Sequence, residues 1–232
     1  MDKLKEGLKS LALDGNIYKF KKFMTMLLEY NEKINLTAIT KKDEVIIKHF
    51  LDSLSFFEVI NIEKNASIID VGTGGGFPGI PIKLVRDDLN ITLLDSLQKR
   101  INYLNDVIDA LSLENICTIH SRSEDLGRNE GYREKFDYSI SRAVASLNIL
   151  CEYTLPFVKT GGRLIALKGI NVMEEVATSK DAIKKLSSEI VDIKEVEVPC
   201  SDIKRFIVII EKKETMSEVY PRSYKKIKKE PL

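Results

Sequence analysis

The sequence predicts an α/β protein with a seven-stranded, mostly parallel sheet, flanking helices and a helical N-terminal cap. The first 60 residues carry apolar side chains at helical spacing, whereas from residue 66 short apolar runs alternate with helical stretches. Strands that alternate with helices indicate parallel strands joined by right-handed crossovers. The last two runs are too close for an intervening helix, which predicts one antiparallel strand at or near an edge.

The N-terminal cap, residues 1–60, is expected to hold two amphipathic helices. Apolar residues recur there at intervals of three and four, which places them on one helical face. The first face comprises Phe20, Phe23, Met24, Leu27 and Leu28, and the second comprises Ile47, Phe50, Leu51 and Leu54. The polar stretch YNEKINLTAITKKDE connects them.

Residues 61–213 are expected to form the sheet domain. The predicted strands are ASIIDV (66–71), ITLLDS (91–96), ICTIH (116–120), FDYSIS (136–141), RLIALK (163–168), IKEVEVP (193–199) and RFIVIIEK (205–212). Between them we expect a short helix at GIPIKLVR, a helical stripe from Leu97 to Leu111 and a charged amphipathic helix over 172–190. Residues 214–232 are expected to form a basic C-terminal tail.

Composition places the chain among globular proteins. Of its 232 residues, 44% are hydrophobic and 31% charged, and the net charge of +1 gives no sign of a nucleic-acid partner. No apolar run has the length of a membrane span and no signal peptide precedes the first helix, so we expect a cytoplasmic protein that binds no membrane. Cys117, Cys151 and Cys200 are too dispersed for a zinc site or a disulfide framework. We expect buried thiols and no metal.

Residues 70–79, DVGTGGGFPG, place five glycines in ten positions between the first predicted strand and the following helix. Glycine loses more backbone entropy on folding than other residues, so this cluster needs a functional reason. Helix N-termini attract anionic groups, and open α/β sheets bind ligands at the carboxyl ends of their strands. We therefore expect a cofactor at this turn, with Asp95 accepting hydrogen bonds from both ribose hydroxyls of an adenosine.

Two cofactors fit this turn. The stretch from Gly74 to Gly79 matches the dinucleotide pattern G-x-G-x-x-G, with Asp95 about 20 residues further on. The stretch from Asp70 to Gly76 matches D-x-G-x-G-x-G, which resembles the S-adenosylmethionine loop of Rossmann-like methyltransferases. The terminal hairpin resembles that of the seven-stranded methyltransferase sheet and favours the second pattern. An NAD-dependent oxidoreductase is the alternative.

Further stretches carry a family resemblance. They are YNEKINLTAI (30–39), HFLDSL (49–54), DVGTGGGFPGIPI (70–82), LLDSLQKRINYL (93–104), SRSEDL (121–126), FDYSISRAVASL (136–147) and LIALKG (164–169). Together they resemble, over nearly the whole chain, the bacterial small-subunit (16S) rRNA guanine-N7 methyltransferase family, also called glucose-inhibited division protein B. The resemblance implies that residues 61–213 form a methyltransferase domain. It also implies methyl transfer from S-adenosylmethionine to N7 of one guanine, guanine-527, in 16S rRNA of the small ribosomal subunit. A non-catalytic RNA-binding module is a further alternative.

The resemblance also implies site residues by position. Those expected to contact the cofactor are Gly72, Gly74, Phe77, Asp95, Ser96, Leu97, Ser123, Glu124 and Arg142. Ser123 and Glu124 are expected at the adenine edge. Those expected to contact the RNA are Asn35, His49, Asp52, Arg142, Lys168 and Arg222. Arg142 and Lys168 are the candidates for a catalytic role, and no catalytic residue is assigned.

The residue pattern agrees with guanine N7 as the acceptor, because N7 has an exposed lone pair and no proton to remove. The position after the fourth strand reads SRAV, not the Asn or Asp with Pro-Pro-Tyr used on exocyclic amino groups. Pro199-Cys200 resembles the pair used on pyrimidine C5, but we expect it far from the cofactor end of the sheet. Asp52 or Glu124 is expected to offset the positive charge of the methylated guanine.

The tail, YPRSYKKIKKEPL, combines five basic residues with two tyrosines. Such a segment can neutralise phosphates and stack on bases, and a solvated terminus is the alternative. It lacks the glycine–proline turn that usually follows YPR in the family, which leaves its path open. On the RNA-contact interpretation, deleting 222–232 should leave cofactor binding unchanged.

Overall fold

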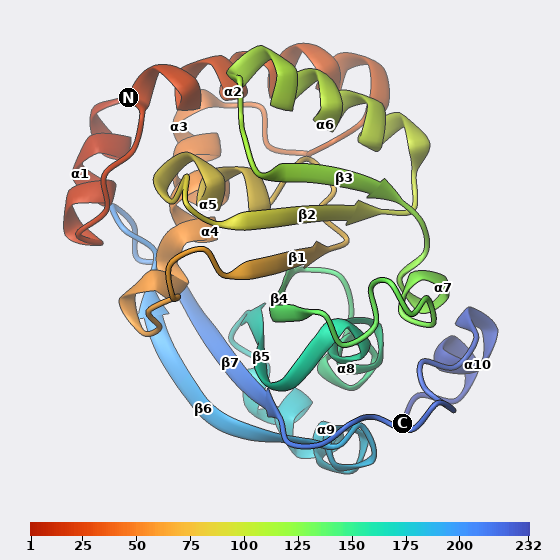
Figure 1. The fold of residues 1–232 in the computed structure, drawn as a ribbon. Coiled ribbons are helices and arrows are strands. Elements are labelled where there is room, and N and C mark those ends of the chain that lie inside the picture. Colours follow the sequence, from red (N-terminus) through yellow and green to blue (C-terminus); the bar gives the residue numbers. More distant parts are fainter.

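The computed structural model describes all residues, 1–232, and contains the predicted seven-stranded sheet (Figure 1). The strands are β1 Ser67–Val71, β2 Asn90–Asp95, β3 Ile116–His120, β4 Phe136–Arg142, β5 Val158–Lys168, β6 Ser188–Glu197 and β7 Lys204–Lys212. They are arranged in the order β3-β2-β1-β4-β5-β7-β6. The first five are parallel, and β7 is antiparallel to both β5 and β6. The predicted fold class is confirmed.

The N-terminal region is helical, as its periodicity predicts. It comprises α1 Asp2–Ser10, α2 Ile17–Ile34, α3 Lys42–Val45, the π-helix η1 Ile46–Leu51, α4 Asp52–Leu54 and the 3-10 helix η2 Ser55–Glu58. The side chain of Asn16 caps α2 by accepting a hydrogen bond from the Lys19 N–H. Asn35 ends the helix in a left-handed conformation.

The other helices lie on both sides of the sheet (Figure 1). They are α5 Gly79–Val85, α6 Gln98–Leu111, α7 Ser123–Leu126, α8 Leu147–Thr154, the 3-10 helix η3 Leu155–Phe157, α9 Val172–Lys185 and α10 Tyr224–Lys229. The cores show which face each helix covers. Helices α5 and α6 share one core with the N-terminal helices, whereas α8 and α9 contribute to the core on the opposite face.

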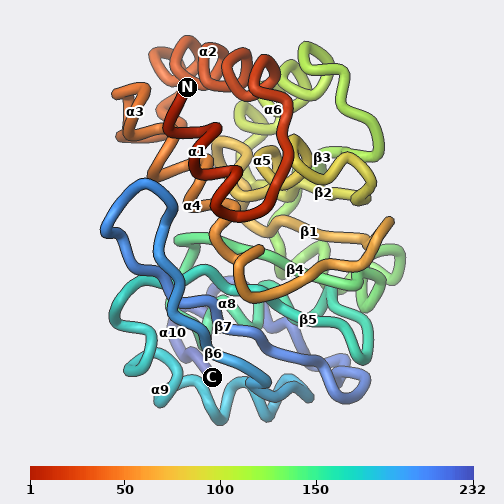
Figure 2. The backbone as a smooth tube through the Cα atoms, turned by 90° about the vertical axis from the view of Figure 1, so that its left-hand side faces the viewer, coloured from red at the N-terminus to blue at the C-terminus, as the bar shows by residue number.

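Alternation along the strands explains these two faces. In β5, Ile165 and Leu167 belong to the core that includes the N-terminal helices, whereas Leu164 and Ala166 belong to the core under α8 and α9. The N-terminal helices therefore pack on the same sheet as α5 and α6, and Figure 2 shows α1, α2 and α5 grouped in the half of the molecule that holds β2 and β3. The helical cap shares its core with the sheet domain.

Three predicted elements, α9, β6 and β5, have wrong boundaries. Helix α9 ends at Lys185, not at 190, because Ser187 adopts a left-handed φ of 54° that ends the helix. Strand β6 consequently runs over Ser188–Glu197 and not over 193–199. Strand β5 begins at Val158, five residues before the predicted start, and pairs there with Phe136 across an irregular register.

The turn between β6 and β7 corrects a further prediction. Because β7 is antiparallel to β5, its first residues lie beside the carboxyl end of β5, with Lys168 opposite Phe206. Pro199 and Cys200 in that turn therefore lie at the carboxyl edge of the parallel strands, not far from it. The Cys200 thiol contacts the Lys3 carbonyl, 3.4 Å away, so the turn rests on α1.

The prediction of buried thiols holds only for Cys151. Cys117 lies on β3, the edge strand, and Cys200 lies in a turn, so both are exposed. None of the helices combines the length and apolar character that crossing a membrane would require.

Candidate active site

The glycine loop leaves β1 in a conformation that only glycine adopts readily. Gly72, Gly74 and Gly76 have φ values of 75°, 58° and 94°. Asp70, fully buried at the end of β1, holds the loop by accepting hydrogen bonds from the Thr73 hydroxyl at 2.7 Å and from the Gly79 N–H at 2.8 Å. Burial raises the pKa of Asp70 to about 7, opposed by those two hydrogen bonds.

Asp95 connects this loop to the end of β2. Its Oδ2 accepts a hydrogen bond from the Gly74 N–H at 3.0 Å, and its Oδ1 accepts one from the Leu97 N–H at 2.9 Å. Arg100 also contacts Oδ2, at 3.2 Å. A carboxylate has about four acceptor positions, and three are occupied here, so Oδ1 can still accept a hydrogen bond from a ligand hydroxyl.

A cavity of about 140 Å³ lies between the ends of β1, β2 and β3. The sequence prediction placed Gly72, Asp95, Ser96, Ser123 and Glu124 at the cofactor, and the structure brings these five together in its lining. The remaining lining residues are Val71, Leu94, Ser121, Arg122, Val144, Tyr153 and Tyr224.

This cavity suits an adenosine group by its chemistry. Glu124 is 4% exposed, and its Oε1 has no hydrogen-bond partner, so a buried acceptor faces a space that a ligand donor would fill. Asp95 provides a second acceptor at the other end of the lining, as expected for ribose hydroxyls. This pair of acceptors therefore fits S-adenosylmethionine, with both acidic groups at its adenosine part.

Four of the predicted cofactor contacts, Gly74, Phe77, Leu97 and Arg142, lie outside this lining, and Arg142 lines a second cavity. Phe77 is 7% exposed and belongs to the main core, where its ring stacks on His49 with centroids 4.5 Å apart. Leu97 is 41% exposed and precedes α6 as its N-cap residue. Gly74 contributes through its N–H to Asp95.

A larger cavity, of about 890 Å³, opens beside the ends of β4 and β5. It brings together four of the predicted substrate residues, namely His49, Asp52, Arg142 and Lys168. Val144 lines both this cavity and the adenosine cavity. The two cavities therefore adjoin at a single residue of the segment that follows β4.

Arg142 and Asp52 form the centre of the larger cavity. The Arg142 guanidinium donates to Asp52 Oδ2 at 2.9 Å and to the carbonyls of Lys48 and His49 on the π-helix at 3.1 and 3.4 Å. Asp52 is 3% exposed, and its other oxygen accepts from Arg205 Nε at 2.8 Å. Both Asp52 oxygens are thus engaged by arginines, and the expectation that Asp52 or Glu124 offsets the charge of the methylated guanine stays a prediction.

His49 is held as a neutral ring. Burial, followed by the nearby Arg142 charge, lowers its pKa to about 3. One ring nitrogen lies 2.7 Å from the Thr37 hydroxyl and the other 3.2 Å from the Arg142 guanidinium. Because the guanidinium can only donate, the nitrogen facing Arg142 accepts, and the other donates to Thr37.

The remaining predicted substrate residues have other neighbours. The Lys168 amino group donates to the Ala145 carbonyl and to Glu175, at 2.7 Å each, and is 7% exposed. It therefore fixes the segment after β4 and is not free for a phosphate. Asn35 is exposed and lines neither cavity.

Arg222 lies in the tail, where its guanidinium forms a two-pronged ion pair with Glu152. Glu152 is 1% exposed, so the contact anchors the tail to α8. The guanidinium is thus engaged by Glu152, and the contact of Arg222 with RNA stays a prediction.

Sequence reasoning missed Arg205, Tyr153 and Tyr224. The signal for Arg205 was the antiparallel direction of β7, which brings the start of that strand to the edge where β5 ends. Tyr153 gave no sequence signal, and the sequence marked Tyr224 only as a tail residue able to stack on RNA bases, because α8 and α10 reach the adenosine cavity only through tertiary packing.

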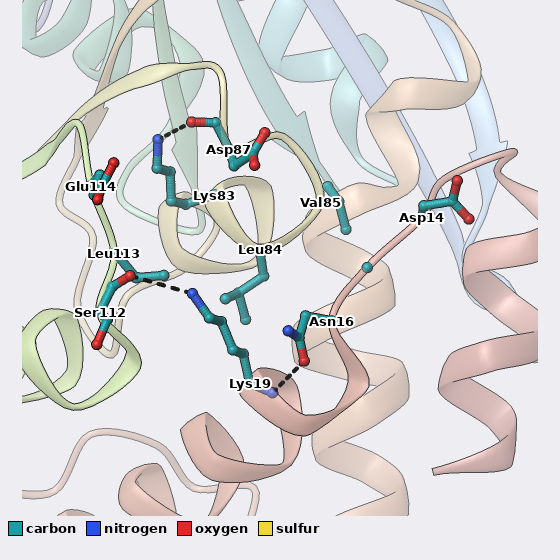
Figure 3. Close-up of a pocket in the computed structure, with 11 residues that line it drawn as sticks. Asp14, Asn16, Lys19, Lys83, Leu84, Val85, Asp87, Ser112, Leu113 and Glu114 are labelled. Atoms are coloured by element: carbon teal, nitrogen blue, oxygen red, sulfur yellow. Dashed lines mark hydrogen bonds between the residues drawn. The ribbon is translucent and has the colours of Figure 1, made fainter.

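A further cavity, of about 640 Å³, lies at the opposite edge of the sheet (Figure 3). It is bounded by the segments that precede α2, β2 and β3. Its lysines are already bound, Lys83 to the Asp87 carbonyl and Lys19 to the Ser112 carbonyl (Figure 3). This cavity lies away from the carboxyl ends of the strands, so we place the active site at the other two.

The sheet order, the glycine loop and the acidic adenosine cavity define a Rossmann-like methyltransferase. Solved structures with this fold include "M. jannaschii TYW2 in complex with AdoMet", with a TM-score of 0.54 at 15% identity, covering 75% of this chain and 79% of that one. Another is a mutant of MtNAS in complex with S-adenosylmethionine, with a TM-score of 0.57 at 13% identity over 85% and 76% of the two chains. At these identities the likeness shows the fold alone.

The chain belongs to the rRNA small subunit methyltransferase G family, whose model matches residues 16–204. A relative named ribosomal RNA small subunit methyltransferase G, from Thermoanaerobacter sp. (strain X514), is 51% identical over 217 residues, covering 94% of this chain and 90% of its own. A relative of the same name from Clostridium perfringens (strain SM101 / Type A) is 45% identical over 234 residues, covering 100% and 98%. The predicted cofactor, S-adenosylmethionine, is confirmed, and the alternative of an NAD-dependent oxidoreductase is excluded.

Proposed function

We propose that the protein transfers a methyl group from S-adenosylmethionine to small-subunit 16S rRNA, with N7 of guanine-527 as the acceptor. The observation that carries this proposal is the pair of cavities that adjoin at Val144. The smaller has the acidic groups suited to adenosine, and the larger has the size and the cationic rim suited to a nucleotide. A methyl donor and its acceptor need this adjacency, because in-line displacement requires close approach.

Bound S-adenosylmethionine supplies a methyl group on a positively charged sulfur, which a lone pair can attack directly. Guanine N7 presents such a lone pair without a proton, so the protein needs to position the base and not to deprotonate it. The larger cavity is consistent with this requirement. The pKa of His49 is about 3, and its ring N–H donates a hydrogen bond to the Thr37 hydroxyl. Asp52 forms ion pairs with two arginines. Asp70, with its pKa near 7, lines neither cavity.

In this proposal Arg142 positions the guanine at the junction of the two cavities. A guanidinium matches the O6 and N7 edge of guanine in geometry, but N7 must stay free for attack. We therefore assign Arg142 to O6 or to the adjacent phosphate. Asp52 fixes the position of Arg142, and Lys168 fixes the Ala145 carbonyl beside it.

Arg205 and Lys48 are the exposed cations of the cavity, with side chains 28% and 42% exposed. We assign them to phosphates that flank the target base. Each phosphate contact to single-stranded RNA adds about 0.7 to the slope of log affinity against log salt. Lys48→Ala should therefore weaken RNA binding and lower that slope by roughly this amount.

The test is methylation of small subunits that lack the modification. After incubation with S-adenosylmethionine, borohydride reduction and aniline should cleave 16S rRNA at one new position, guanine-527. Arg142→Ala should greatly reduce this cleavage, and Arg142→Lys should restore part of it if charge contributes. Cys200→Ser serves as the control at the same edge and should leave cleavage intact.

Two outcomes would overturn the assignment. Methyladenosine or 5-methylcytidine in the digest would show that the acceptor atom is wrong. Loss of activity in Cys200→Ser would show that a covalent thiol step takes part.

A further inference from the structure

The C-terminal segment, residues 220–232, reaches the adenosine cavity, although its sequence indicates only a charged tail. Tyr224 of α10 lines that cavity together with Tyr153 of α8. Figure 1 shows α10 beside α7 and α8, far along the chain from the glycine loop. The segment follows the last strand of the sheet, so its position there requires specific anchoring.

Three contacts anchor the segment. The Arg222 N–H and guanidinium all donate to Glu152, at 2.7 to 3.1 Å, and Glu152 is 1% exposed. Ile227 is fully buried in a core that also contains Tyr153 and residues of β1 and β2. Arg133 donates to the Tyr220 carbonyl at 2.7 Å. The segment is thus built into the fold at the edge that holds the cofactor.

Two buried polar atoms in the cavity lining have no hydrogen-bond partner in the protein, although the Arg122 guanidinium lies 3.9 Å from one of them, Glu124 Oε1. The two atoms are Glu124 Oε1 and the Tyr153 hydroxyl, in residues that are 4% and 8% exposed. Burial raises the pKa of Tyr153 to about 12, so its hydroxyl keeps its proton and can donate. One acceptor and one donor in the same cavity lining complement the 6-amino group and a ring nitrogen of adenine.

Tyr224 adds an aromatic ring at the mouth of the cavity. Its side chain is 42% exposed, and the Arg122 guanidinium lies 4.6 Å from the ring centroid. Arg122 itself lines the cavity, next to Glu124. The Arg122 guanidinium thus contacts the Tyr224 ring within the cavity lining.

We propose that the C-terminal segment forms a wall of the cofactor site, in which Tyr153 donates a hydrogen bond to adenine and Tyr224 packs against it. The inference depends on the cofactor of the family and not on the RNA assignment. Removing the segment should therefore weaken cofactor binding, contrary to the interpretation of 222–232 as an RNA tail alone.

Calorimetric titration with S-adenosylhomocysteine tests each residue without RNA. Tyr153→Phe and Tyr224→Ala should each weaken binding by about 3- to 10-fold. Lys228→Ala is the matched control, because Lys228 is exposed in the same helix and outside the lining, and it should change affinity less than twofold. Thermal unfolding of the free Tyr153→Phe protein should match wild type, because the lost hydroxyl has no partner. Wild-type affinity in both tyrosine variants would overturn the proposal.

The preference of the protein for adenine over hypoxanthine shows whether Tyr153 contacts the base directly or acts only through packing. In S-inosylhomocysteine the ring nitrogen N1 carries a hydrogen and cannot accept from Tyr153. Wild type should prefer the adenosine compound, and Tyr153→Phe should reduce that preference. An unchanged ratio, with both affinities lowered equally, would show that Tyr153 acts only through packing.

A double variant tests the anchoring. Arg222→Ala should release the segment and weaken binding as Tyr224→Ala does, and combining the two should add less than twofold. Fully additive effects would show that Tyr224 does not act through the docked segment. If cofactor binding responds as expected but no rRNA is methylated, the RNA assignment fails and this proposal stands.

Discussion

At the scale of single residues, Asp52 shows how one buried carboxylate organises the proposed substrate cavity. It holds Arg142 from β4 and Arg205 from β7 with separate oxygens. A buried carboxylate without its arginines would be costly, and two arginines without the carboxylate would repel each other. The three side chains therefore depend on one another, and together they determine where the charged groups of the cavity lie.

Gly79 is a residue at which close packing excludes even a methyl group. A Cβ there would lie 2.3 Å from Leu93 Cδ2 and 2.8 Å from Asp70 Oδ2. Gly79→Ala should lower the free energy of unfolding by about 1–3 kcal/mol, measured by urea denaturation. Gly169→Ala is the control, since a Cβ there meets nothing within 4 Å, and it should stay within about 0.5 kcal/mol of wild type. Equal stabilities for the two variants would contradict this account.

His49 should make stability depend on pH. Its pKa is about 3 in the folded protein against 6.5 in the unfolded chain, so between these values only the unfolded chain binds the proton. The contribution of His49 to the free energy of unfolding is complete above pH 6.5. It falls by up to about 1.4 kcal/mol per pH unit on acidification towards pH 3. Asp70, with its raised pKa, acts in the opposite sense between its unfolded value of 3.8 and about 7.

The difference between wild type and His49→Gln isolates the histidine from Asp70. Measured by urea denaturation at several pH values, the advantage of wild type should shrink as the pH falls below 6.5. A difference independent of pH would mean that His49 keeps an ordinary pKa.

At the scale of elements, the π-helix η1 links the N-terminal region to the active site. Its residues 48 and 49 provide carbonyls to Arg142, and the His49 ring contacts the same guanidinium. Such wide turns occur often at functional sites. The N-terminal helices therefore have a role in the site as well as in the core.

Helix α2, which packs beside this region, depends on its N-cap. Asn16→Ala removes the acceptor for the Lys19 N–H and should destabilise the protein by about 1 kcal/mol. Asn16→Asp keeps an acceptor and should retain wild-type stability. The urea midpoint measures the stability of both variants, provided that the dependence of the unfolding free energy on urea is unchanged. Wild-type stability in Asn16→Ala would show that water replaces the cap without cost.

At the scale of the whole molecule, cofactor binding should stabilise the fold, because the site joins the sheet, α8 and the C-terminal segment. S-adenosylhomocysteine at 100 times its dissociation constant should raise the free energy of unfolding by about 2.7 kcal/mol. Differential scanning calorimetry would show this as a higher Tm. NADH should produce no shift, and Gly74→Val should lose the shift, because its φ of 58° disfavours a β-branched residue.

The fold class was accessible from the sequence because periodicity reports local structure. Alternating apolar runs and helical stripes predict a parallel sheet, and DVGTGGGFPG marks the turn where a ligand binds. The position of Asp95 followed, since the carboxyl ends of parallel strands meet at one edge, whereas Ser123 and Glu124 were implied by the family resemblance. Helix α8 and the docked α10 were not predicted, and α9 was drawn five residues too long.

Tertiary structure alone decided which side chains are free to act. Lys168 and Arg222 are residue types that bind phosphates, but their side chains form ion pairs with Glu175 and Glu152. Arg205, overlooked in the sequence, lies at the substrate cavity because β7 runs antiparallel. The sequence determined the strands, the glycine turn and the family, since these depend on local pattern and motif. The partners of each charged group depend on contacts between residues far apart in the chain, which only the folded molecule brings together.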